Sequence, residues 1–239
     1  MTPITVMLLL TSLAGLAMPL GAVLARVENI APEWLERELR HSVIAFGGGV
    51  LLAAVALVLV PTGIERLHWG VSCAAFVGGG LTFLGLDILL ARAEGSASQL
   101  IAMLADFVPE AIALGAGFAT GEPTGVLLAI LIALQNLPEG FNAYRELRAS
   151  TGLRPAKIVI AFAALAMLGP ISGLSGYFLL GDRPEMVAGI MLFAGGGILY
   201  LTFEDIAPQA KVENRYAPAM GAVLGFMLGM VGHMLTMAP

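Results

Sequence analysis

Eight long apolar stretches divide this sequence of 239 residues, and short polar segments separate them. An α-helix needs about 20 mostly apolar residues to cross the hydrocarbon core of a bilayer. Every stretch meets this length, and together they occupy nearly the whole chain. They cover 3–25, 42–63, 69–91, 98–120, 123–147, 155–180, 186–207 and 217–237. We therefore expect an all-α membrane protein of eight transmembrane helices, forming a single transmembrane domain over 1–239.

The composition argues against other classes of protein. Hydrophobic residues make up 58% of the chain and charged residues only 12%, whereas soluble domains average about 25% charged residues. The 12 Lys and Arg against 17 Asp and Glu give a net charge of -5, which is unsuited to a nucleic-acid partner. The single cysteine, Cys73, excludes disulfides and thiolate metal clusters within one chain.

The basic residues are distributed unequally between the two sets of loops. Only Arg66 and Arg183 follow the even-numbered stretches. The loops after the odd-numbered stretches hold Arg26, Arg37, Arg40, Arg92, Arg145, Arg148, Arg154, Lys157, Lys211 and Arg215. Because basic loops stay in the cytoplasm, we expect both termini to lie outside. The polar segment 28–40 is expected to form a short helix on the cytoplasmic face.

The second and seventh stretches share a weak repeat. A glycine triplet at 47–49 precedes Pro61, and a second triplet at 195–197 precedes Pro208 at nearly the same interval. The two stretches cross the membrane in opposite directions, as in the inverted repeats of transporters. The glycines alone would also be explained by close helix packing. The predicted 3+2+3 arrangement has repeat one at about 1–91, a central pair at about 98–147 and repeat two at about 155–239.

The central pair carries acidic residues at mid-depth. The fourth stretch has Asp106 and Glu110 and the fifth has Gln135 and Glu139, each pair four residues apart and so on one helix face. A proline precedes each glutamate. An ionised side chain at the bilayer centre costs about 2.5–3.5 kcal/mol, and the spans offer no Lys or Arg at this depth. A divalent cation such as Mn, Fe, Zn or Cd would neutralise the site; protonated acids that hydrogen-bond across the helices are the alternative.

These two segments resemble the paired H-N-x-P-E-G signatures of the ZIP (ZRT/IRT-like) divalent metal transporters. The motifs cover about 106–146, and the span pattern covers the chain. The resemblance implies eight helices with both termini outside and one complete metal site of Asp106, Glu110, Gln135 and Glu139. It implies no cofactor, because the metal ion is the transported substrate.

The departures from the family pattern concern its second metal position. Asp106 replaces the family's first histidine, and Phe107 replaces the asparagine that follows it. Asn136 matches the family's Asn or Asp, but 167–173 lacks the acidic residue of helix six. We therefore expect the second site to be lost or impaired, with Asn136 only a secondary candidate. The missing histidine also puts a preference for zinc in doubt.

Acidic residues near the ends of the spans are further candidates. Glu204 and Asp205 lie at the inner end of the seventh stretch, and Glu204 is the better match to the family's exit ligands. Glu65, at the outer end of the second stretch, is interpreted as an ordinary interfacial carboxylate. Asp87 is interpreted as a hydrogen-bonded structural acid or a proton carrier.

The favoured function is transport of divalent metal ions into the cytoplasm by alternating access. We expect a multi-pass protein of a bacterial inner membrane, with metal ions and the bilayer as partners and a homodimer left open. One alternative is a proton-coupled carrier of a small non-metal solute that uses the same carboxylates. Another is an intramembrane aspartyl protease with Asp87 and Asp106 as its pair, although Gly85-Leu86-Asp87 only partly matches the protease signature. The favoured prediction is that the protein is not an enzyme.

Overall fold

The structure, a computed structural model, describes residues 2–27, 33–92, 98–121, 124–210 and 216–237. Within these ranges the regular structure is entirely helical, and eight helical segments are long and apolar enough to cross a membrane. The predicted all-α class and the count of eight spans are therefore confirmed.

Five spans are single helices, and three are divided into shorter helical elements. The undivided spans are α1 (Pro3–Val27), α4 (Trp69–Arg92), α5 (Ser98–Thr120), α6 (Gly125–Ser150) and α11 (Ala217–Met237). The second span consists of α2 (Glu33–Ala54), the π-helix η1 (Val55–Leu59) and α3 (Val60–Ile64). The sixth consists of α7 (Pro155–Leu165) and α8 (Leu168–Leu180). The seventh consists of α9 (Pro184–Leu201), the π-helix η2 (Thr202–Ile206) and α10 (Ala207–Gln209).

The predicted surface helix over 28–40 is not a separate element where the structure describes it. α2 begins at Glu33 and continues without a break into the second span. No Gly or Pro lies between Glu33 and Phe46 to interrupt it. Residues 28–32 lie outside the described part of the chain.

The two π-helices lie at matching places in the second and seventh spans. η1 begins six residues before Pro61, and η2 begins six residues before Pro208. A proline inside a helix removes one hydrogen bond and crowds the carbonyl four residues earlier. A π-turn accommodates such a defect, and π-turns are frequent at functional sites.

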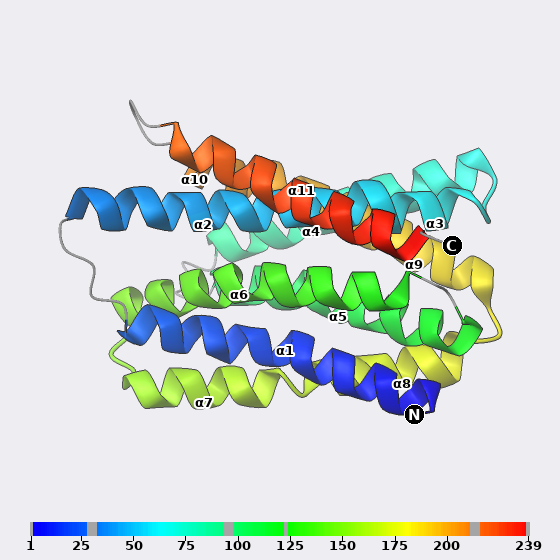
Figure 1. Ribbon diagram of the computed structural model, residues 1–239, viewed down its shortest axis with the longest axis horizontal. Helices are drawn as coiled ribbons and strands as arrows, with labels where there is room; N and C mark the ends of the chain where they lie inside the picture. Colours follow the sequence, from blue (N-terminus) through cyan, green and yellow to red (C-terminus); the bar gives the residue numbers. More distant parts are fainter. Residues whose placement is uncertain (1, 28–32, 93–97, 122–123, 211–215, 238–239) are drawn as a thin grey trace.

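The helices pack as four extensive pairs: α1 with α6, α5 with α8, α2 with α11, and α4 with α9. Further contacts join α1, α5, α6, α7 and α8 into one group, which we call the lower group after its place in Figure 1. The upper group consists of α2, α3, α4, α9, α10 and α11 with the two π-helices. The two groups meet mainly where α2 contacts α6 and where α5 contacts α9. α1 begins and α11 ends at the same end of the bundle (Figure 1).

Small residues let backbones touch within these pairs. A side chain added at Gly196 of α9 would meet the carbonyl of Phe76 on α4, and one added at Gly79 would meet the carbonyl of Phe193. α5 and α8 approach equally closely, because Gly176 lies against the carbonyl of Ile112. In contrast, a side chain added at Gly47 of the upper group would meet side-chain atoms of Pro138 on α6, the nearest being its Cγ atom at 2.8 Å. The glycines therefore bring backbones together inside each group. Between the groups, where Gly47 faces Pro138, the contact is with a side chain instead.

Candidate metal site

The predicted ligands lie on the facing sides of α5 and α6 at the centre of the bundle. Asp106 is 2% exposed, and Glu110 and Gln135 are completely buried. Glu139 is half-buried. Pro109 and Pro138 stand inside continuous helices, one residue before each glutamate. The four-residue spacing therefore places each polar pair one turn apart on a buried face, as the sequence predicts.

Two amide side chains make contacts between helices. The Nε2 atom of Gln135 donates to the Oε2 atom of Glu110 at 2.7 Å, which joins α6 to α5. The Nδ2 atom of Asn136 donates to the carbonyl of Ala14 at 3.0 Å, which joins α6 to α1. Asn136 thus uses its N–H to hold two helices of the lower group together, and only its oxygen remains for a ligand.

The remaining polar atoms of the site are oxygens that accept hydrogen bonds. Several are buried and have no hydrogen-bond partner in the part of the chain that the structure describes. They are Asp106 Oδ1, Glu110 Oε1, Gln135 Oε1, Asn136 Oδ1 and Glu139 Oε2. A buried acceptor without a donor is costly. Such oxygens are the ligands that hard and borderline divalent cations take.

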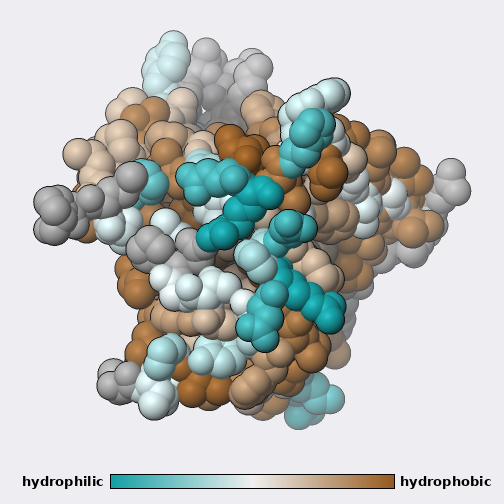
Figure 2. Space-filling view, turned by 90° about the vertical axis from the view of Figure 1, so that its right-hand side faces the viewer, coloured by the Kyte–Doolittle hydropathy of each residue, from teal (hydrophilic) through white to brown (hydrophobic). Residues whose placement is uncertain are grey.

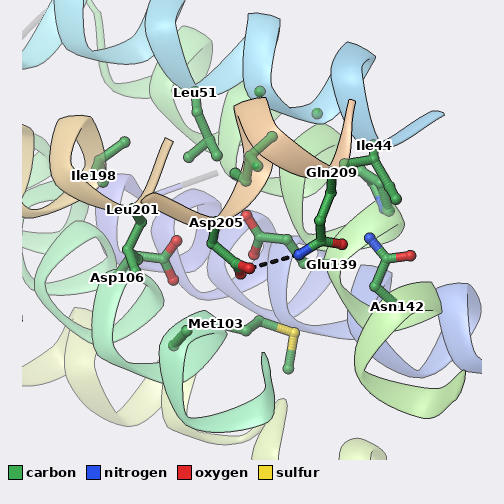
Figure 3. Close-up of a pocket in the computed structure, with 15 residues that line it drawn as sticks. Ile44, Leu51, Met103, Asp106, Glu139, Asn142, Ile198, Leu201, Asp205 and Gln209 are labelled. Atoms are coloured by element: carbon green, nitrogen blue, oxygen red, sulfur yellow. Dashed lines mark hydrogen bonds between the residues drawn. The ribbon is translucent and has the colours of Figure 1, made fainter. Parts of the chain in front are cut away.

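A cavity of about 30 Å³ lies beside these residues, between the two helix groups. Asp106 and Glu139 line it from the lower group, and Asp205 of η2 lines it from the upper group. Figure 3 shows the three side chains around one space, with the Nε2 atom of Gln209 donating to the Oδ1 atom of Asp205 at 2.5 Å. Glu110 and Gln135 do not line this cavity and lie one helical turn beyond it.

Asp205 is a further functional candidate, which the sequence placed behind Glu204. The sequence favoured Glu204 as the exit ligand, but Glu204 is exposed and lines a neighbouring cavity of about 130 Å³. The π-turn of η2 carries both residues, and it is Asp205 that reaches the cavity of Asp106 and Glu139. The sequence feature that could have pointed to Asp205 is Gln209. It follows four residues later and therefore lies on the same helix face.

Asp87 is hydrogen-bonded, as predicted. The hydroxyl of Tyr200 on α9 donates to its Oδ2 atom at 3.0 Å. Asp87 lines the neighbouring cavity with Glu204, whereas Asp106 lines the central one. This arrangement does not support the aspartyl-protease alternative, which requires the two aspartates to face each other. Glu65 is exposed where α3 ends.

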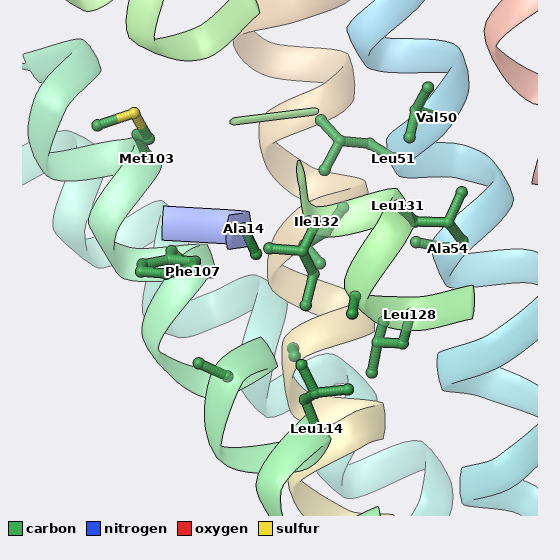
Figure 4. Close-up of a cluster of buried hydrophobic side chains, with 14 of the residues drawn as sticks. Ala14, Val50, Leu51, Ala54, Met103, Phe107, Leu114, Leu128, Leu131 and Ile132 are labelled. Atoms are coloured by element: carbon green, nitrogen blue, oxygen red, sulfur yellow. The ribbon is translucent and has the colours of Figure 1, made fainter. Parts of the chain in front are cut away.

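The cavities lead from the site toward one end of the bundle. A cavity of about 490 Å³ shares Ile44, Asn142 and Gln209 with the central cavity and extends to Arg40 and Ala149. Toward the other end, a cluster of buried apolar side chains fills the space between the helices (Figure 4). It includes Leu114, Leu128, Leu131 and Ile132, all at most 1% exposed. Figure 2 shows that far end, where hydrophilic residues gather in the middle of a largely hydrophobic face.

The acidic residues do not form a ready-made metal centre. Across the described ranges, no three His, Cys, Asp or Glu side chains are grouped so that they could hold an ion. Glu110 is turned toward Gln135 rather than toward the cavity. At the family's second position, Phe107 is completely buried, and its ring lies against Gly169 of α8.

Comparison with known proteins identifies two relatives. The zinc transporter GufA of Myxococcus xanthus is 30% identical over 134 residues, which are 55% of this chain and 52% of GufA. The zinc transporter ZupT of Corynebacterium efficiens is 26% identical over 272 aligned residues, which cover 95% of each protein. The match thus spans about half the length of GufA and nearly all of ZupT. No family model matches the chain.

Proposed function

We propose that the chain carries divalent metal ions across a bacterial inner membrane into the cytoplasm. This function follows from the resemblance to the ZIP family, which the two relatives confirm. Zinc is the first candidate because both relatives are named zinc transporters. Manganese, iron and cadmium are the others, since Asp106 supplies an oxygen where an imidazole would favour zinc.

The observation that carries this proposal is the set of buried oxygens without donors between α5 and α6. Asp106, Glu110 and Glu139 bring three carboxylates to this set, and Gln135 adds an amide oxygen. A dehydrated divalent cation would satisfy these acceptors and offset the cost of acidic residues at this depth. In the proposed bound state, Glu110 offers its Oε1 atom to the ion and completes a site with Asp106 and Glu139.

Alternating access is supported by the different packing on the two sides of the site. Cavities lie on the side of Arg40, and the apolar cluster around Leu128 closes the other side. The helix ends on the cavity side carry Arg26, Arg40, Arg145 and Arg148, so the positive-inside rule makes this side cytoplasmic. We therefore propose that the structure represents an inward-open state with both termini outside. We propose that the ion passes from Asp106 and Glu139 to Asp205 before it leaves.

The proposed 3+2+3 inverted repeat is supported by the helix pairing. If the first three spans correspond to the last three and α5 corresponds to α6, the α1–α6 pair corresponds to α5–α8. The α2–α11 pair then corresponds to the pair of α4 and α9. The matched positions of η1 and η2 before their prolines agree with the same relation.

Thermal unfolding of the purified protein tests the proposed function. A ligand that binds only the folded state stabilises it by about 2.7 kcal/mol when its concentration is 100 times Kd. We expect Zn²⁺ or Mn²⁺ to raise Tm in detergent after chelation and dialysis, and Mg²⁺ at the same concentration to leave it unchanged. A proton-coupled solute carrier would show the same Tm with and without each of the transition metals, which would contradict the proposal.

A further inference from the structure

The cytoplasmic cavity next to the metal path is lined by arginines, which is unexpected for a cation exit. Arg40 of α2 and Arg145 of α6 both line this cavity of about 490 Å³. Asn142 and Gln209 add side-chain amides, and Glu146 is the single acidic residue among its lining residues. The cavity therefore has one positive charge in excess and many N–H donors.

Arg40 supplies the observation that points to a ligand. Its Nε atom is buried and has no hydrogen-bond partner among the described residues. Arg145 is held from one side by Phe141, whose ring centre lies 5.6 Å from the guanidinium carbon. Arg40 lines the cavity, and its guanidinium keeps hydrogen-bonding capacity at Nε that no described residue uses. The cavity is large enough to admit an acceptor for the guanidinium.

We propose that this cavity binds a phosphate group, contributed by an anionic lipid or by free inorganic phosphate. The planar guanidinium donates two parallel N–H groups to phosphate oxygens better than any other side chain. Basic pockets between transmembrane helices on the cytoplasmic side are known to hold lipid headgroups. Because Arg40 belongs to the upper group and Arg145 to the lower group, the bound phosphate links the two groups at the cytoplasmic end.

The position of Arg40 distinguishes it from arginines that serve only to orient the chain in the membrane. Arg154, which precedes α7 in a loop of the same side, is exposed. Each residue contributes one positive charge to this end of the bundle, but only Arg40 lines the cavity. Arg154→Gln is therefore a matched control for Arg40→Gln.

Native mass spectrometry of the full chain tests the site. Delipidated protein is titrated in one arm with inorganic phosphate and in the other with a short-chain phosphatidylglycerol. We expect a one-to-one adduct in at least one arm, and that arm identifies the source of the phosphate. In Arg40→Gln the adduct should bind about tenfold more weakly, as expected when a charge-assisted hydrogen bond is lost; Arg154→Gln should bind as the wild type does.

Three results would overturn the proposal: no adduct in either arm, an undiminished adduct in Arg40→Gln, or an equal loss in Arg40→Gln and Arg154→Gln. A measurement on the wild type alone covers the case in which Arg40→Gln does not fold. Phosphate or the lipid should raise Tm relative to chloride at equal ionic strength, and an unchanged Tm with both ligands would also refute the site. Neither measurement involves a metal ion, so failure here is distinct from failure of the proposed transport function.

Discussion

The amide of Gln135 donates to the carboxylate of Glu110 at 2.7 Å, and both side chains are completely buried. This bond links the two helices that carry the predicted metal ligands. It occupies only one of the two carboxylate oxygens of Glu110, because the Oε1 atom has no hydrogen-bond partner among the described residues. Glu110 can therefore offer Oε1 to an ion while Gln135 holds the carboxylate in place.

Gln135→Leu removes the donor and leaves a buried carboxylate oxygen without a partner. We expect it to destabilise the metal-free protein by about 1–3 kcal/mol, seen as a lower Tm in detergent. Gln209→Leu is the comparison, because Gln209 also donates to a carboxylate but is only half-buried. Its effect should be smaller. Equal Tm values for both variants would contradict the importance of the buried bond.

Asp106→His tests whether Asp106 is a ligand. The substitution replaces an oxygen by the imidazole that the family has here, and imidazole suits zinc better than manganese. We expect the ratio of zinc to manganese affinity to rise in competition assays. If the ratio stays at the wild-type value, Asp106 does not contact the ion.

Asp205→Asn tests the residue that the structure adds to the path. Asp205 faces the cavity of Asp106 and Glu139, whereas Glu204 is exposed beside it. We expect metal uptake to fall about tenfold or more in Asp205→Asn and to stay near the wild-type rate in Glu204→Gln. The reverse ranking would restore Glu204 as the exit ligand.

Gly196→Val tests the close packing of α9 against α4. The new side chain would meet the backbone of Phe76, which cannot move aside as a flexible side chain can. Overpacking of this kind costs about 1–3 kcal/mol, and Tm should fall accordingly. Gly78→Val is the control, because a side chain added at Gly78 meets nothing within 4 Å. A Tm for Gly196→Val equal to that of the control would contradict this packing.

The sequence predicted most of the fold because apolar length and proline-flanked acids are local signals. The eight spans and the buried positions of Asp106, Glu110 and Gln135 were all predicted. The continuity of α2 was missed because the polar stretch before the span resembles an interfacial helix. No Gly or Pro interrupts the helix between Glu33 and Phe46, so the polar stretch continues the helix of the span.

The details of the site depend on tertiary contacts that a single sequence does not contain. The amide of Asn136 is directed to Ala14, 122 positions away in the chain. Asp205 lines the cavity from a π-turn, and the sequence does not reveal where a helix contains such a turn. The partner of Asp87, Tyr200, lies on a helix that is distant in sequence. These relations are set by how α1, α4 and α9 pack.

The most direct test of the central claim is uptake of metal ions into proteoliposomes. The wild type is compared with Glu110→Gln, with Glu139→Gln, and with Glu185→Gln, a control at an exposed position in the first turn of α9. At equal incorporation, we predict that the first two variants fall to the rate of protein-free vesicles and that the control matches the wild type. Uptake of Zn, Mn, Fe, Co or Cd at wild-type rates by Glu110→Gln or Glu139→Gln would show that the ion does not pass between α5 and α6 through these carboxylates.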